Sequence, residues 1–214
     1  MSHPLWQEEY WLYIIQLFLK KPEGVKHLYS RPLVDLSLEL HIEPAYLHAQ
    51  LRRLRHIDSP KLRRLWDKYS MRPKQLDKKV DILRRMRGFG NAEAFYKDVE
   101  VEVDWERMYK PLPSEPRLKP FMLVIILDLY FRLTPNTMVD ETPEIIELAK
   151  LTHIPTQLIV DVLQCFLACD PYLNFVPNMD NNLLAPCSAI WNEYGSLQPQ
   201  QLEGIAAQMK FYFN

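Results

Sequence analysis

Two stretches of the chain decide how its fold is interpreted: LVDLSLELHIEPAYLHAQLRRLRHID (33–58) and IIELAKLTHIPTQLIVDVLQCFLACD (145–170). They align without a gap when the chain is laid on itself at an offset of 112 residues. The identical pairs are Leu36 and Leu148, His41 and His153, Ile42 and Ile154, Leu51 and Leu163, and Asp58 and Asp170. Four further apolar residues, Leu33, Val34, Leu47 and Leu54, also meet apolar residues, whereas Leu40 meets Thr152. The alignment predicts an internal duplication.

Two further blocks match in the same order. Upstream, at the same offset, Ile14, Leu17, Phe18 and Leu19 meet Ile126, Leu129, Tyr130 and Phe131. Downstream, LWDKY (65–69) matches IWNEY (190–194) and Pro73 matches Pro199, which places about 13 extra residues within 173–187. Two copies are too few for a solenoid, so we expect two similar domains. The expected organisation is unit 1 over 1–88, a connector over 89–121 and unit 2 over 122–214.

The segment ELAKLTHIPTQLIVDVLQCF (147–166) resembles the general helix-turn-helix pattern, and 35–54 repeats it in the first copy. The turn of this pattern usually carries glycine because its backbone is left-handed. Both copies carry histidine instead, His41 and His153, and histidine tolerates positive φ better than most residues. Pro44 and Pro155 suit the first turn of the second helix. The alternative is an ordinary pair of packed helices in an α bundle.

Winged-helix domains follow this helix pair with a β-hairpin, and the second copy has a candidate. Tyr172–Val176 and Leu183–Leu184 flank a turn signal at 177–182, which the first copy lacks. The alternation in VEVEVDW (99–105) predicts a strand, and Pro111, Pro113, Pro116 and Pro120 predict an extended linker. We therefore predict a mostly α protein of two tandem winged-helix-like units with minor β structure.

The charge is divided unevenly between the two halves. Residues 1–90 have a net charge of +8, and residues 91–214 have a net charge of −9. Within 52–87, fourteen lysines and arginines outnumber four aspartates, which favours nucleic-acid binding, and DNA binding in particular, by unit 1. The candidate contact residues are Tyr46, His48, Arg52, Arg53, Arg55, Lys61, Arg63 and Arg64. Alternatively, this basic face docks on the acidic second unit or on an acidic partner.

The equivalent helix of unit 2 offers a different surface. Its outward positions are predicted to be Gln157, Leu158, Val160, Asp161 and Gln164, which include no cation. Leu158, Val160 and Asp161 are therefore candidates for protein contact, within the chain or in a dimer. The leading hypothesis is DNA binding by unit 1 with unit 2 serving assembly. The second is a protein-interaction or scaffold module that keeps the winged-helix shape without binding DNA.

Other classes of function find little support in the sequence. No phosphate-binding glycine loop, nucleophile elbow or zinc-protease motif occurs, so we expect no enzyme, cofactor or metal. Cys165, Cys169 and Cys187 are expected to fill a core, and the recurring Trp66 and Trp191 to share one packing role. No apolar run reaches the roughly 20 residues of a membrane span. With three cysteines and no secretory signal, we expect a cytoplasmic protein without membrane contact.

Overall fold

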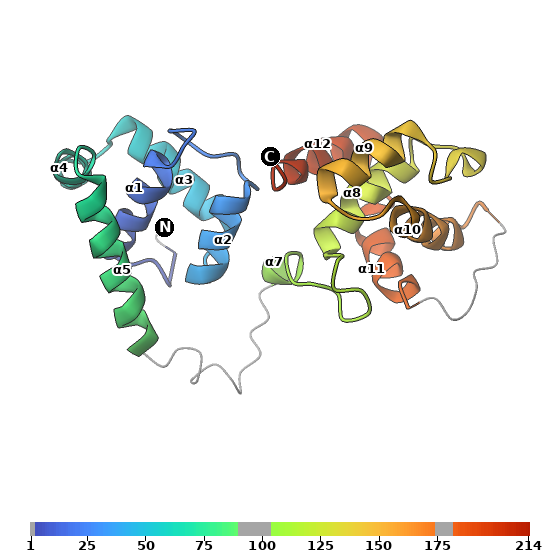
Figure 1. The fold of residues 1–214 in the computed structure, drawn as a ribbon, viewed down its shortest axis with the longest axis horizontal. Coiled ribbons are helices and arrows are strands. Elements are labelled where there is room, and N and C mark those ends of the chain that lie inside the picture. The colour runs from blue at the N-terminus through green and yellow to red at the C-terminus, as the bar shows by residue number, and fades with distance from the viewer. Residues whose placement is uncertain (1–2, 90–103, 174–181) are drawn as a thin grey trace. The chain divides into compact units, whose positions relative to one another are not determined.

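The computed structural model describes residues 3–89, 104–173 and 182–214, and every regular element in these ranges is a helix. The chain divides into two compact units, Met1–Val103 and Asp104–Asn214 (Figure 1). The predicted mostly α class is confirmed. The described ranges contain no strand, so the predicted minor β structure is not found there.

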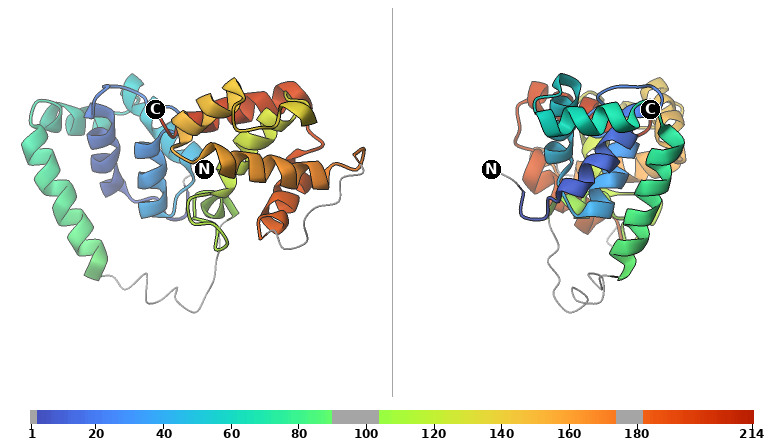
Figure 2. Two further views of the ribbon diagram at one scale, coloured as in Figure 1. Left: turned by 45° about the vertical axis from the view of Figure 1, so that its right-hand side comes forward. Right: turned by 90° about the vertical axis from the view of Figure 1, so that its left-hand side faces the viewer.

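Unit 1 is built around its first α-helix. Its elements are the 3-10 helix η1 (Glu8–Tyr10) and the α-helices α1 (Trp11–Leu19), α2 (Arg31–Leu40), α3 (Pro44–His56), α4 (Pro60–Tyr69) and α5 (Pro73–Phe89). Helix α1 packs against α2, α3, α4 and α5, and five of its nine residues are buried. Two views show α4 near one end of α1 and α5 alongside it (Figure 2). A helix that is apolar on most sides is stable only inside a core, which accounts for its central position.

Unit 2 repeats this plan around a more completely buried helix. Its elements are α7 (Asp104–Arg107), α8 (Pro120–Tyr130), the 3-10 helix η2 (Pro135–Thr137), α9 (Pro143–Thr152), α10 (Thr156–Cys169), α11 (Leu184–Tyr194) and α12 (Pro199–Lys210). Every residue from Phe121 to Tyr130 is buried, and α8 packs against α10, α11 and α12. Helix α8 is therefore the counterpart of α1.

Helix bounds and core contacts repeat at the offsets seen in the sequence. Adding 112 to the bounds of α2 gives those of α9, and α5 and α12 both begin with a proline, Pro73 and Pro199. The rings of Phe18 and Trp66 meet edge to face, with centroids 5.5 Å apart. The equivalent rings of Tyr130 and Trp191 also meet edge to face, at 5.6 Å. The recurring tryptophans thus share one packing role, as predicted.

The segments between the repeated helices differ from expectation. Part of the predicted connector belongs to unit 2, where Tyr109, Leu112 and Leu118 are buried. Of the predicted strand 99–105, residues 99–103 lie outside the described residues, and the last two are helical because they begin α7.

The predicted hairpin of unit 2 is also corrected in part. Residues 174–181 lie outside the described residues. Its second predicted strand, Leu183–Leu184, is not a strand, because Leu183 lies in a turn and Leu184 begins α11. Proline is disfavoured only beyond the first turn of a helix, so Pro186 does not prevent this early start.

Candidate nucleic-acid interface

Each unit contains two helices joined by a three-residue turn whose first residue is left-handed. His41 ends α2 with φ 54°, and His153 ends α9 with φ 58°, which confirms the positive φ expected at these histidines. In unit 1 the backbone N–H groups of His41 and Ile42 both donate to the carbonyl oxygen of Ser37. Helices α9 and α10 are bent by 113° at the turn, within the 90–120° typical of a helix-turn-helix.

Helix α3 has the amphipathic character that the sequence predicts. Leu47, Leu51 and Leu54 are fully buried on its inner side. Its outer side exposes Ala45, Ala49, Arg52 and His56. Only the last two of these carry a polar side chain, so the first two turns of the outer side expose little that hydrogen-bonds.

The residues that precede α1 cover one flank of α3. We call residues 3–10 the N-terminal strap. The His3 ring lies 5.3 Å from the Tyr46 ring, and the Trp6 ring lies 5.6 Å from it, between centroids. Tyr46 is therefore half-buried under aromatic neighbours from its own unit. Sequence reasoning missed this contact, since no pattern links positions forty residues apart.

Arg53 lies on the same flank, and its guanidinium group is engaged in contacts within unit 1. Its Nε donates to the Asp58 carboxylate at 2.6 Å, and its Nη1 donates to Gln50 at 3.0 Å. Its guanidinium lies 5.5 Å from the centre of the Trp11 ring, close enough for a cation–π contact. These three interactions hold Arg53 against unit 1.

His48 is held from the other flank of α3. Burial lowers the pKa of His48, and the positive charge of Arg52 lowers it further, while a hydrogen bond to the backbone of Lys26 acts in the opposite direction. An unperturbed histidine titrates near 6.5, so His48 is mostly neutral at pH 7. It adds no positive charge to the surface.

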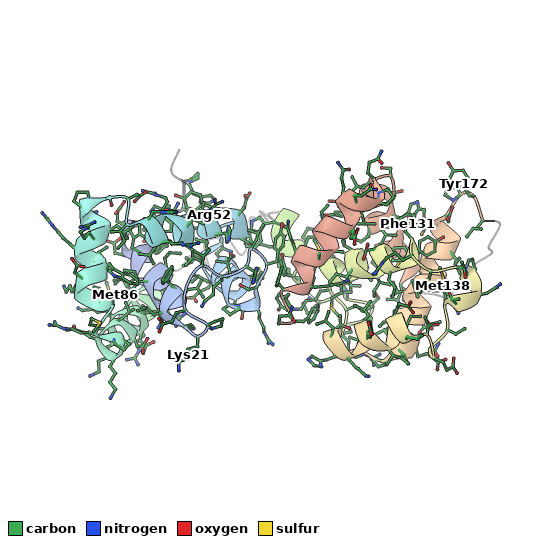
Figure 3. The ribbon with its side chains drawn as sticks, turned by 90° about the horizontal axis from the view of Figure 1, so that it is seen from above. Lys21, Arg52, Met86, Phe131, Met138 and Tyr172 are labelled. Carbon is green, nitrogen blue, oxygen red and sulfur yellow. The ribbon has the colours of Figure 1, made fainter. Side chains whose placement is uncertain are left out.

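Four of the predicted contact residues remain exposed and unpaired. Arg52 and Arg55 on α3, and Arg63 and Arg64 on α4, are exposed and make no ion pair with any residue that the structure describes. We call these four residues the arginine surface, and Figure 3 shows Arg52 at the surface of unit 1. In contrast, Lys61 pairs with Glu8 of the strap at 2.9 Å.

Helix α4 presents its cations in the way its sequence dictates. Leu62 and Tyr69 face the core of unit 1, and the Ser59 hydroxyl accepts a hydrogen bond from the Leu62 N–H at the start of the helix. Successive residues of an α-helix are turned by about 100°, so Arg63 and Arg64 lie about 100° and 200° around the helix from the buried Leu62 and point away from the core. Further cations are exposed on α5, at Lys74, Lys78, Lys79 and Arg85.

The equivalent helix of unit 2 is buried on most sides. Leu158 and Val160 are each only 6% exposed, so they lie in the interior and not on a free surface. Asp161 is half-buried and accepts a hydrogen bond from Gln157 at 3.1 Å. Leu158 also lines a small cavity of about 280 Å³ with the ion-paired side chains of the 114–117 loop. The outward position predicted for Leu158 and Val160 is therefore wrong, and Asp161 is only partly exposed.

Unit 2 exposes apolar side chains elsewhere, and sequence reasoning missed them. Phe131 is 45% exposed and Tyr172 is 92% exposed, and Figure 3 labels both on unit 2. The three cysteines bury as predicted, two fully and one partly. Among the described residues, no group of three metal-ligating side chains is suitably placed for a metal ion.

Comparison with family models, with curated proteins and with solved structures finds no match for this chain. In the described ranges, no single helix has both the length and the apolar character needed to cross a membrane. Helices α9 and α10 meet both criteria only when taken together, and they are sharply bent at His153.

Proposed function

We propose that this protein binds DNA through the basic surface of unit 1. The observation that carries the proposal is the arginine surface: four exposed guanidinium groups without ion-pair partners in the described chain, on α3, which follows the left-handed turn at His41, and on the next helix, α4. Contacts between such cations and phosphates supply most non-specific affinity for DNA, because each contact releases condensed counterions. Arginine also binds phosphate bidentately.

The proposal includes a winged-helix-like character for both units. The left-handed turns and the 113° bend between α9 and α10 support the helix-turn-helix part of it. A wing in unit 2 would fall mostly outside the described residues. At its outward positions, helix α10 exposes Gln157 and Gln164, and the half-buried Asp161 beside them adds a negative charge that repels phosphate. Unit 2 is therefore assigned to assembly and not to DNA contact.

Fluorescence anisotropy with a labelled random duplex of about 20 base pairs, at about 50 mM salt, tests the proposal. We expect the intact chain to bind, and the double variant Arg63→Ala/Arg64→Ala to bind about tenfold more weakly or worse, since two phosphate contacts are lost. The control Lys110→Ala/Lys150→Ala removes the same charge from exposed positions of unit 2 and should bind as the unaltered chain does. Absence of binding by the intact chain contradicts the proposal.

A second candidate function is self-association through unit 2 without DNA binding. The exposed rings of Phe131 and Tyr172 favour it, because large exposed apolar side chains can supply a protein contact. Sedimentation velocity of the intact chain and of Phe131→Ser/Tyr172→Ser tests it. A dimer that dissociates in the double variant supports self-association, whereas a monomer at all concentrations argues against it.

A further inference from the structure

The side of unit 1 that would read base edges is largely occupied by the unit's own residues. In a helix-turn-helix, the N-terminal part of the second helix contacts the bases, and phosphate contacts only position the protein. The corresponding part of α3 exposes Ala45 and Ala49, which have no hydrogen-bonding group. The polar residues between them are Tyr46 and His48, and both are half-buried.

Both flanks of this part of α3 are closed by contacts within unit 1. His3 and Trp6 of the N-terminal strap pack on the Tyr46 ring, at 5.3 and 5.6 Å between centroids. The strap is held at its other end by the Glu8–Lys61 ion pair, at 2.9 Å. His48 is half-buried on the opposite flank, close to the backbone of Lys26.

The exposed cations lie beyond the occupied region. The arginine surface occupies the C-terminal half of α3 and the outer side of α4, and only Arg52 follows closely on the base-reading positions. Arg53, which would lie beside it, is held by Asp58 and Trp11. Several exposed cations are therefore available to phosphate, whereas at the base-reading end of α3 the exposed side chains that can hydrogen-bond a base edge are Glu43, just before the helix, and Arg52.

We propose that unit 1 binds the phosphate backbone of duplex DNA irrespective of base sequence. This inference rests on the proposed function. It assigns the arginine surface to phosphate contact and excludes Tyr46 and His48 from base readout, because the strap and the α1–α2 loop hold them.

The test compares affinities across sequences. Dissociation constants are measured by anisotropy at about 50 mM salt for a set of unrelated duplexes, including sequences enriched from a random pool by repeated selection on the intact chain. We expect all duplexes to agree within about threefold. A selected duplex that binds more than about tenfold tighter overturns the inference, since one specific base contact is worth about 1–3 kcal/mol. That outcome leaves DNA binding itself intact, whereas a failure of every duplex to bind refutes the proposed function.

Conservative variants provide the second arm. Tyr46→Phe keeps the ring that packs on Trp6 and removes the hydroxyl, and His48→Gln keeps a polar side chain without the imidazole. Both should bind every duplex as the intact chain does, whereas Arg52→Ala should weaken binding to all duplexes by a similar factor. A change in the ranking of sequences in Tyr46→Phe or His48→Gln contradicts the inference. Circular dichroism confirms that each variant is folded.

Discussion

The salt dependence of DNA binding measures how many phosphates the arginine surface contacts. If each of its four guanidinium groups neutralises one phosphate, the logarithm of the binding constant falls with the logarithm of salt concentration with a slope of about −3.6. Raising the salt from about 50 to about 200 mM should then weaken binding about 150-fold. Cations on α5, such as Lys74 and Lys78, would steepen the slope if they also reach the duplex.

Removing two of the four arginines halves the expected slope. For Arg63→Ala/Arg64→Ala we expect a slope of about −1.8, so that the same change of salt weakens binding only about 12-fold. The measurement is a titration of labelled duplex followed by anisotropy at four salt concentrations. The unit 2 control Lys110→Ala/Lys150→Ala should keep the slope of the intact chain.

Two results would refute this reasoning. A slope shallower than about −1 for the intact chain means that few phosphates are contacted. An unchanged slope in Arg63→Ala/Arg64→Ala means that α4 does not contact the duplex, whatever the affinity is.

Three further predictions concern stability. Leu51→Ala and Leu163→Ala each truncate a fully buried side chain at the same place in the repeat and should lower the free energy of unfolding of their unit by about 2–5 kcal/mol. Amide exchange should become faster first in α1–α5 for Leu51→Ala and first in α8–α12 for Leu163→Ala. Exchange that accelerates equally in both units in either variant would contradict this. Tyr130→Phe removes a hydroxyl that donates to Asp170 at 2.7 Å and should cost about 1–3 kcal/mol in urea unfolding, because the carboxylate loses its partner; a cost near zero would show that water replaces the bond. The pKa of His48 is lower in the folded chain than in the unfolded chain, so the unfolded chain takes up this proton first as the pH falls. The free energy of unfolding is therefore unaffected by His48 above about pH 6.5 and decreases below it. An NMR titration should place the His48 midpoint below about 6.5, and His48→Gln should reduce the pH dependence of unfolding.

The helical frame was predictable because its signals are local and occur twice. Apolar residues recur every three or four positions in 33–58 and 145–170, and this spacing defines the inner side of each helix. The presence of two copies reduces the chance of coincidence. Prolines mark helix starts because they fit the first turn and nowhere deeper, as at Pro44, Pro73 and Pro199. Pro155 falls one residue before its helix, within the ordinary uncertainty of a helix boundary.

The surface was less predictable because it depends on contacts between distant residues. Nothing in the sequence near Tyr46 indicates that Trp6 covers it, so four of the eight predicted contact residues proved to be held within unit 1. In unit 2, Leu158 and Val160 were interpreted as an outward face. The polar stripe of α10 is narrow, since it consists of Gln157, Asp161 and Gln164, and apolar residues on either side of such a stripe are normally buried.

The left-handed histidines limit how the sequence of this protein can drift. At φ 54° and 58°, the Cβ atom of an L-residue approaches the following carbonyl oxygen, and the cost is greatest for β-branched residues, whereas glycine, asparagine and aspartate are accepted at little cost. A saturation library at position 41 or 153, sorted for folded protein, should therefore retain a short list of residues in place of the broad polar set accepted at exposed helix positions. Positions 41 and 153 are therefore exposed positions at which the backbone conformation constrains the sequence.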